Sequence, residues 1–357
     1  MSRNIGFALI GCGVISTRHA EEIAAIEGAE LVAVADVDRD KAKALSARFS
    51  VDWYVDYQEM LKRDDVDVVN ILTPSGMHAE MAIDAARAGK HVVVEKPMDI
   101  HLDKAKAMVQ ACRDAGVKLS IISQHLFDRS TIRVKEEIEQ GSLGNMVLGQ
   151  AAIHWYRSQE YYDSGDWRGT WKLDGGGVLM NQGIHTIDIL QHLMGPVESV
   201  HAHTATLAHE RIEVEDVAVA TLKFQNGALG TIVGTTSAFP GFSARLELFG
   251  TNGSAIINND ILTHLYIRKE GEQGAMYGRG PAENLADISS ASESAGASSE
   301  PAAISGFSHR MQILDMINAI HEDREPFING EKGLKPLEIV LAIYKSAETG
   351  HPVFLTK

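Results

Sequence analysis

The sequence predicts an α/β protein with a parallel sheet in its first third and a mostly antiparallel sheet in the remainder. Two observations predict this fold class. Over roughly the first 120 residues, short β-branched runs alternate with longer helical patterns, a rhythm typical of right-handed βαβ units. Later in the chain, alternating strand patterns are separated by turn sequences, as in successive hairpins.

The first part alternates predicted strands with predicted helices. The strands are expected at Ile5–Ile10, Leu31–Ala35, Val66–Leu72, His91–Val94 and Lys118–Ile122. The helices are expected at 17–27, 38–48, 77–88 and 101–115. A parallel sheet built from such units is covered by helices on both faces.

The rhythm changes after about residue 124. A helix, a strand and a second helix are expected at Arg133–Gln140, Asn145–Tyr156 and Val178–Met194. From Val197 to Ile267, turn sequences such as Gln225-Asn226-Gly227 separate several alternating strands. This pattern predicts the antiparallel sheet.

The end of the chain combines a long loop with two helices. Residues 270–305 are rich in Gly, Ser, Ala and Glu, which predicts a loop. Helices are expected at 307–321 and 334–349. The 357 residues are therefore divided most economically into two domains, 1–123 and 124–357.

Composition excludes several classes of function. Lys plus Arg number 33 and Asp plus Glu 48, a net charge of −15 that repels nucleic-acid phosphates and anionic membranes. The two cysteines, Cys12 and Cys112, are far apart, so neither a disulfide framework nor a zinc site is predicted. No signal peptide or membrane span is evident, and a cytoplasmic location is expected.

A dinucleotide-binding pattern follows the first predicted strand. Gly11-Cys12-Gly13-Val14-Ile15 joins that strand to a helix, which is the setting the dinucleotide fingerprint requires. Gly11 permits a tight turn, Gly13 allows a pyrophosphate to approach the backbone, and the helix N-terminus supplies N–H donors. Ser16 replaces the usual third glycine, and a strand-to-helix turn without a ligand is the alternative interpretation.

Asp36 at the end of the second strand supports the dinucleotide interpretation. It lies 23 residues beyond Gly13, where a carboxylate can accept hydrogen bonds from both ribose hydroxyls. A carboxylate there repels a 2′-phosphate, so NAD is favoured over NADP. Arg39 leaves NADP open, because a guanidinium can bind that phosphate; an exposed residue at the start of a helix is the other interpretation.

Polar residues also follow the later parallel strands. Thr73-Pro74 and Glu95-Lys96 come directly after two strands whose carboxyl ends should line the same crevice as the glycine loop. Lys96 is therefore expected near a nicotinamide. His78 follows in the next helix and is either a cofactor contact or an exposed polar residue.

These motifs, together with Gly183-Ile184-His185-Thr186-Ile187-Asp188, resemble those of the Gfo/Idh/MocA oxidoreductase family. The resemblance covers essentially the whole chain. It implies an N-terminal Rossmann domain, a C-terminal α/β domain with a large open sheet, a substrate pocket between them, and a homodimer or homotetramer. It implies an NAD(P)-dependent enzyme that oxidises or reduces a secondary alcohol of a sugar, cyclitol or sugar derivative.

The resemblance also implies roles for single residues. Lysines matching Lys96 bridge cofactor and substrate hydroxyl, and histidines matching His185 are the acid/base. Asn181 replaces an aspartate that many members carry four residues before that histidine. We therefore expect Asn181 to position the substrate. A buried histidine bonded to a backbone carbonyl is the structural alternative for His185.

The segment before the helix expected at Val178–Met194 is a candidate for substrate contacts. It concentrates aromatic and basic residues, among them Arg157, Trp167 and Arg168, which suit a sugar face and an anionic group. A loop packed at a subunit boundary is the competing account. Gln124 and His125, after the last parallel strand, are either pocket residues or a linker. No metal site is predicted.

Two other functions remain open from the sequence. Some family members cleave glycosides by transient oxidation with a retained NAD, and others bind a dinucleotide as regulators without turnover. The presence of both Lys96 and His185 favours an enzyme.

Overall fold

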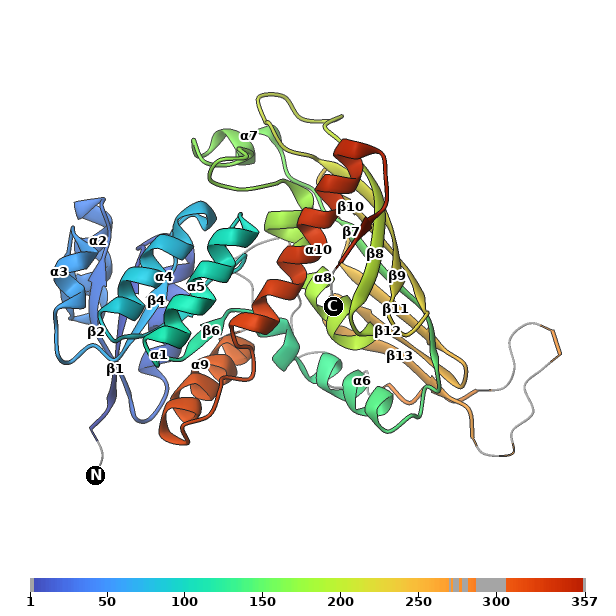
Figure 1. Cartoon of the computed structure of the whole chain (residues 1–357), viewed down its shortest axis with the longest axis horizontal. Helices are drawn as coiled ribbons and strands as arrows, with labels where there is room; N and C mark the ends of the chain where they lie inside the picture. Colours follow the sequence, from blue (N-terminus) through green and yellow to red (C-terminus); the bar gives the residue numbers. More distant parts are fainter. Residues whose placement is uncertain (1–2, 270, 272–275, 278–281, 287–305, 356–357) are drawn as a thin grey trace. The chain divides into compact units, whose positions relative to one another are not determined.

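The computed structural model describes residues 3–269, 271, 276–277, 282–286 and 306–355 (Figure 1). They form two compact units. The first contains the described residues up to 124 with 165–176 and 306–337, and the second contains those of 125–164, 177–305 and 338–357. Each unit is thus assembled from several stretches of chain, and the predicted boundary after residue 123 stays a prediction. The predicted 270–305 loop lies mostly outside the described residues.

The first unit contains a parallel sheet of six strands in the order β3-β2-β1-β4-β5-β6. The strands are β1 (Ile5–Ile10), β2 (Ala29–Ala35), β3 (Asp52–Tyr54), β4 (Val68–Ile71), β5 (His91–Val94) and β6 (Leu119–Ile121). This is the Rossmann order, and the direction of winding reverses between β1 and β4, where ligands bind in open sheets.

Helices cover the parallel sheet. They are α1 (Val14–Ala24), α2 (Arg39–Phe49), α3 (Tyr57–Leu61), η1 (Ser75–Met77), α4 (His78–Arg87), α5 (Leu102–Asp114) and the late helix α9 (Gly306–His321). Helix α9 lies beside α1, and its Ile313, Met316 and Ile317 join the core formed by strand residues such as Phe7 and Leu9. The Rossmann unit is thus completed by a segment from near the end of the chain.

The second unit contains a sheet of eight strands in the order β13-β12-β11-β7-β10-β9-β8-β14. They are β7 (Met146–His154), β8 (Val197–Ala205), β9 (Val217–Phe224), β10 (Leu229–Thr235), β11 (Arg245–Gly250), β12 (Gly253–Asn258), β13 (Ile261–Ile267) and β14 (Val353–Phe354). All neighbouring strands are antiparallel except β7 and β10. The predicted α/β fold with a mostly antiparallel second sheet is confirmed.

Further helices belong wholly or in part to the second unit. They are η2 (Gln124–Phe127), α6 (Arg129–Glu139), α7 (Gln159–Asp163), η3 (Val178–Gly183), α8 (Ile184–Met194) and α10 (Gly330–Thr349); η2 and α10 begin in the first unit. Helix α8 packs on β7 and β11 (Figure 1). Strand β9 alternates buried Ala218, Ala220 and Leu222 with exposed Val219 and Thr221, so only one face is covered.

Several elements differ from the sequence prediction, and the short elements α3, α7 and β14 were not expected. Strand β3 was not expected, because it is short and its side chains are exposed or half-buried. The helix predicted at 178–194 is a π-helix over 178–183 and an α-helix only from Ile184. Among the described helices, none is long and apolar enough to cross a membrane.

Candidate functional site

Gly11 lies at the winding reversal of the parallel sheet. Its backbone φ is +99°, and a Cβ there would meet the carbonyl group of Leu72 at the end of β4. Only glycine therefore suits this position, because the turn after β1 must pass close to β4. The loop of the predicted fingerprint is built as the sequence indicates.

Gly13 leaves open space at the N-terminus of α1. No atom lies within 4 Å of the position that a Cβ would take, and the neighbouring Val14 is 76% exposed. The first turn of α1 contains no acidic residue. Ser16 is buried and its hydroxyl donates to the Gly13 carbonyl, so the third fingerprint position is filled by a small, satisfied side chain. Free N–H donors facing open space suit a pyrophosphate.

Asp36 is fixed at the end of β2. Its two carboxylate oxygens accept the backbone N–H groups of Cys12, at 2.7 Å, and Asp38, at 2.8 Å. Each oxygen retains lone pairs for a further donor, so the arrangement fits the two hydroxyls of an adenosine ribose. Asp38 caps α2 and Asp40 follows in its first turn, which adds negative charge against a 2′-phosphate. Arg39 is exposed at the start of that helix.

His78 joins the ends of β4 and β5. It is 1% exposed, and its ring nitrogens lie 2.7 Å from the Thr73 carbonyl and 2.8 Å from the Pro97 carbonyl. Burial lowers the pKa of His78, although both carbonyls favour the charged ring. The alternative of an exposed polar residue is wrong, because this side chain ties together the two strand tips that carry Thr73-Pro74 and Lys96.

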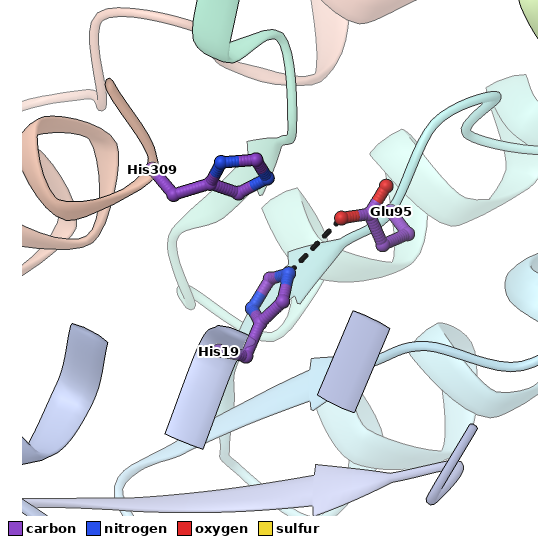
Figure 2. A group of neighbouring side chains, drawn as sticks. All are labelled: His19, Glu95 and His309. Atoms are coloured by element: carbon purple, nitrogen blue, oxygen red, sulfur yellow. Dashed lines mark hydrogen bonds and ion pairs between the residues drawn. The ribbon is translucent and has the colours of Figure 1, made fainter. Parts of the chain in front are cut away.

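Glu95 anchors the backbone of Lys96. Its carboxylate is buried, with one oxygen 3.0 Å from His19 Nε2 and the other accepting the Lys96 N–H at 3.0 Å (Figure 2). Burial raises the pKa of Glu95, but the hydrogen bond from His19 and the charges of His19, His309 and Lys96 outweigh it and lower the pKa to about 2. A buried carboxylate therefore fixes the peptide that carries the predicted catalytic lysine.

His19, Asn70 and His309 complete a buried polar cluster that was not predicted. The Asn70 amide lies 3.0 Å from His19 Nδ1, and the His309 ring meets the His19 ring edge-on at 5.7 Å (Figure 2). Asn70 interrupts the apolar run of β4, and this was the available signal. The two histidines lie on helices 290 residues apart, and no spacing in the sequence relates them.

Glu215 holds the start of the π-helix in the second unit. Its carboxylate accepts the N–H groups of Gly177 and Leu179 at 2.8 and 2.9 Å and the Tyr344 hydroxyl at 2.9 Å. Burial raises the pKa of Glu215 to about 7, and these hydrogen bonds offset it only in part. A Cβ on Gly177 would overlap the Glu215 carbonyl. Two glycines of the run Gly175-Gly176-Gly177 therefore lie close to other parts of the chain, Gly177 to Glu215 and Gly175 to Ile100.

His185 lies in the first turn of α8 and is half-buried. Asp188 follows three residues later in the same α-helix, so the two residues lie on one face of it. Asn181 lies in the π-helix, so α-helical spacing does not give its direction relative to His185. The ring of His125 lies edge-on to that of His185, with centroids 4.9 Å apart. This second imidazole beside His185 was not predicted.

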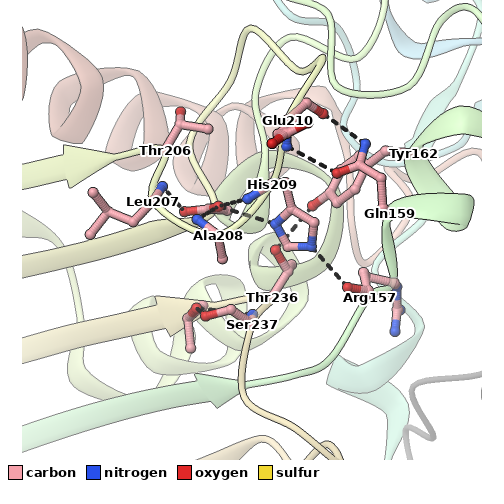
Figure 3. Close-up of polar contacts among 12 residues, drawn as sticks. Arg157, Gln159, Tyr162, Thr206, Leu207, Ala208, His209, Glu210, Thr236 and Ser237 are labelled. Atoms are coloured by element: carbon pink, nitrogen blue, oxygen red, sulfur yellow. Dashed lines mark hydrogen bonds and ion pairs between the residues drawn. The ribbon is translucent and has the colours of Figure 1, made fainter.

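Arg157 is held between aromatic rings in the second unit. Its guanidinium carbon lies 5.3 Å from the Trp155 ring and 5.1 Å from the Tyr161 ring, and its buried Nε has no hydrogen-bond partner among the described residues. The Arg157 carbonyl accepts from His209 at 2.8 Å (Figure 3). A cation with an unused donor in an aromatic setting suits an anionic ligand group.

Asp216 organises the loop that holds Arg157. It accepts the N–H groups of Leu207, Ala208 and His209. Burial raises the pKa of Asp216, but the N–H groups of Leu207 and Ala208 outweigh this and lower it. The carboxylate is therefore a permanent charge within the fold.

The other predicted substrate residues belong to the first unit. Arg168 stacks on Trp167, with its guanidinium carbon 4.5 Å from the ring centroid. Gln124 is buried, and its Oε1 has no partner among the described residues. The structure thus brings Trp167 and Arg168 together, whereas Lys96 and His185 lie in different units and their convergence stays a prediction.

Two groups of described side chains bring atoms of metal-ligand type together. They are His19, Glu95 and His309, and His125, Asp128 and Asp260. In each, a histidine nitrogen lies at hydrogen-bond distance from a carboxylate oxygen, 3.0 and 2.8 Å respectively. Direct hydrogen bonds account for both geometries, and we assign neither as a metal site.

Comparison with known families decides the class of the protein. Residues 5–123 match the model of the oxidoreductase family with an NAD-binding Rossmann fold, and residues 131–256 match the Gfo/Idh/MocA C-terminal domain. The chain belongs to the Gfo/Idh/MocA family. It is an NAD-binding oxidoreductase, and the fingerprint loop and Asp36 described above fit that cofactor.

Three relatives show the range of this family. Myo-inositol 2-dehydrogenase of Thermotoga maritima is 30% identical and covers 97% of both chains. D-apiose dehydrogenase of Paraburkholderia graminis is 28% identical over 98% of this chain and 89% of its own. The WlbA dehydrogenase from Bordetella pertussis, crystallised with NADH and UDP-GlcNAcA, is 35% identical, with a TM-score of 0.84 over 99% of this chain and 100% of its own.

Proposed function

We propose that the protein transfers a hydride between NAD and a secondary alcohol of a sugar, cyclitol or sugar derivative, with Lys96 and His185 as the catalytic residues. The observation that carries this proposal is the anchored position of Lys96. Its N–H is bound by Glu95 directly after β5, beside the winding reversal at which Gly11 lies. Related proteins named as sugar and cyclitol dehydrogenases support it.

We place the cofactor residues around the same winding reversal between β1 and β4. The loop Gly11 to Ile15 would bind the pyrophosphate and Asp36 the adenosine ribose, while Thr73, Pro74 and Glu95 would line the nicotinamide side. His78 would act by holding the two strand tips together, since both its ring nitrogens face carbonyls. NAD, when bound, supplies the hydride acceptor.

The protein must remove the hydroxyl proton as the hydride departs. An imidazole titrates near neutral pH and suits this task, so His185 would accept the proton from the substrate oxygen. Lys96 would donate a hydrogen bond to the same oxygen and polarise it in the reverse direction. Asn181, four residues before His185, would bind a neighbouring hydroxyl.

The substrate residues favour a sugar that carries an anionic group. Arg157, Trp167 and Arg168 combine guanidinium and aromatic groups, and Gln124 offers a buried, unused oxygen. The relative crystallised with UDP-GlcNAcA is 35% identical to this chain. Sugar nucleotides and sugar acids therefore join neutral sugars and cyclitols as candidate substrates.

A substrate panel tests the proposal. Purified protein is mixed with NAD or NADP and each candidate, and NADH absorbance is followed. We expect net formation of reduced cofactor with at least one member, NADH from NAD being formed faster than NADPH from NADP. The absence of turnover across neutral sugars, cyclitols, sugar acids and sugar nucleotides in both directions would contradict the proposal.

We also propose that the protein is a cytoplasmic homo-oligomer. Its subunits would contact one another through the exposed face of the second sheet. Leu148 pairs with Leu229, and Val219 with Val233, so apolar side chains lie side by side on that face. The cysteines Cys12 and Cys112 are both free, which suits a reducing compartment. Sedimentation should show a dimer or tetramer that Leu229→Asp dissociates, and a monomeric native protein would exclude this surface.

A further inference from the structure

A second histidine contacts the predicted catalytic histidine. The rings of His125 and His185 are nearly perpendicular, with an interplanar angle of 78° and centroids 4.9 Å apart. Both belong to the second unit, His125 in η2 and His185 in the first turn of α8. A charge on one imidazole at this distance must influence the protonation of the other.

Asp128 binds His125 instead of capping its own helix. It occupies the N-cap of α6, where an aspartate usually accepts a backbone N–H, yet its side chain makes no capping hydrogen bond. Its Oδ2 lies 2.8 Å from His125 Nδ1. Helix α6 therefore lacks the stabilisation of a side-chain cap, because the Asp128 carboxylate contacts the His125 imidazole instead.

Asp260 approaches the same nitrogen from a hairpin turn. Asn259 and Asp260 connect β12 to β13 and have φ of 53° and 61°, a two-residue turn whose second position usually belongs to glycine. An aspartate there costs backbone strain, and its Oδ1 lies 3.5 Å from His125 Nδ1. A strained residue that directs a carboxylate at a buried ring indicates a function for the pair.

Two other charged groups described in the second unit lie on α8 and α6. Asp188 lies one turn along α8, and Lys135 of α6 donates to the His192 carbonyl farther along. Strands β7 and β11 pack against α8 with buried apolar residues such as Ile153 and Leu248. The π-helix before α8 contains no charged residue. Within the second unit, His125, backed by two carboxylates, lies directly against His185.

We propose that His125, held and charged by Asp128 and Asp260, is a positioning residue that orients the His185 ring and keeps it in the proton-accepting form. Two carboxylates at Nδ1 stabilise the imidazolium of His125. That positive charge beside His185 opposes its protonation, so His185 remains a base at neutral pH. The inference deepens the proposed function, because it rests on His185 as the acid/base.

Histidine titrations in the full chain test this charge coupling without any substrate. The protein is labelled at histidine, and the ring resonances are assigned by their loss in His125→Gln and His185→Asn. In His125→Gln, the titration midpoint of His185 should rise by about one pH unit, because a neighbouring cation is lost. In Asp128→Asn, the midpoint of His125 itself should fall by a similar amount.

The variant Asp260→Gly removes the carboxylate beside His125 and keeps a residue that suits the turn. Glycine suits the turn, so the melting temperature should be kept or raised, while the His125 midpoint falls. Glu136→Gln removes an exposed carboxylate from the same helix α6 and is the matched control, which should move neither midpoint. The proposal is wrong if His125→Gln leaves the His185 midpoint unchanged, or if Asp128→Asn and Asp260→Gly both leave the His125 midpoint unchanged. If one of these variants fails to fold, the remaining variants decide the test.

The pH profile of turnover connects the coupling to the reaction. In His125→Gln, the acidic limb of kcat/KM should move to higher pH with NAD affinity unchanged, whereas a purely structural role would lower activity equally at every pH. Shifted midpoints without turnover of any substrate would disprove the proposed function and leave the coupling intact. Turnover with an unshifted acidic limb would overturn the positioning role.

Discussion

We propose Asp36 as the residue that distinguishes NAD from NADP. Its carboxylate is oriented by the N–H groups of Cys12 and Asp38 and retains lone pairs for ribose hydroxyls. Asp36→Ala should weaken NAD binding by roughly 10- to 100-fold, because about 1.5 to 3 kcal/mol is lost with hydrogen bonds to a charged group. NADP should be weakened less, since repulsion of its phosphate is also removed.

Titration calorimetry with both dinucleotides measures this difference. Asp40→Ala removes a nearby exposed carboxylate from α2 and should change NAD affinity little. Equal losses of NAD and NADP affinity in Asp36→Ala would contradict the ribose assignment.

Lys96 and His185 should each be needed for turnover. Lys96→Ala and His185→Ala should reduce kcat by about 100-fold or more, the usual range for lost acid–base catalysis, without weakening NAD binding. Since we propose that both act on one oxygen, the double variant should lose little more than the worse single variant. Steady-state rates that fall by the product of the two single effects would indicate independent roles.

The sequence could place residues at strand ends but not those that support them. Gly11, Asp36 and Lys96 directly follow buried strands, so the direction of a parallel sheet locates them. His19 and His309 come from helices far apart in the chain, and only packing brings them to Glu95. The sequence makes His125 a pocket candidate, but it does not reveal that the ring lies beside His185 and Asp260, which belong to distant parts of the chain.

Two glycines at the starts of helices differ in what surrounds them. Gly177 approaches the Glu215 carbonyl at the start of the π-helix, whereas Gly13 faces open space at the start of α1. Gly177→Ala should therefore destabilise the fold by about 2 kcal/mol or more, since overlap with backbone cannot be relieved by a side-chain movement. Gly13→Ala should leave stability nearly unchanged and weaken NAD binding.

Urea unfolding and NAD titration of both variants test this pair. Each variant is the control for the other. Equal stabilities of Gly177→Ala and the native protein would show that the π-helix can shift away from Glu215.

Glu215 should make the second unit less stable as the pH rises. Its pKa in the folded protein is about 7, against an ordinary value of 4.5, so the folded state holds the proton more tightly. Its contribution is complete below about pH 4.5 and is lost progressively up to about pH 7, by about 3 kcal/mol. Glu215→Gln removes this titration, so the stability of the variant should change less between pH 5 and 7.

Urea unfolding at several pH values measures the slope. Glu213→Gln, an exposed neighbour, should retain the native pH dependence. A native slope in Glu215→Gln would show that Glu215 is ionised throughout.

Element types were predicted well where burial follows a simple period. Strands β1 and β5 have the predicted bounds, because each is a continuous apolar run in a sheet covered on both faces. The π-helix at 178–183 escaped prediction, since a hydrophobic pattern does not reveal that Glu215 binds the first N–H groups. Short β3, with its exposed side chains, carried no pattern either.

At the scale of the whole molecule, neither unit follows a single stretch of sequence. Helix α9 belongs with the Rossmann core through Ile313, Met316 and Ile317, although it comes after the whole second sheet. Residues 165–176, with Trp167 and Arg168, also belong to the first unit. The alternation of strand and helix patterns predicts the two sheets and their helices. It does not predict which later segments pack into the first unit, because that depends on long-range contacts.

The same division separates the two proposed catalytic residues. Lys96 is fixed by Glu95 in the first unit, and His185 is contacted by His125 in the second. Their action on one substrate requires the two units to present these side chains to a common pocket.

A crystal structure of the protein with NAD and a substrate from the panel tests that requirement most directly. The account predicts the Lys96 ammonium and the His185 imidazole within about 3 Å of the same substrate oxygen, next to the nicotinamide ring. Side chains of Lys96 and His185 that enter separate cavities, or a substrate oxygen bound by neither, would contradict it.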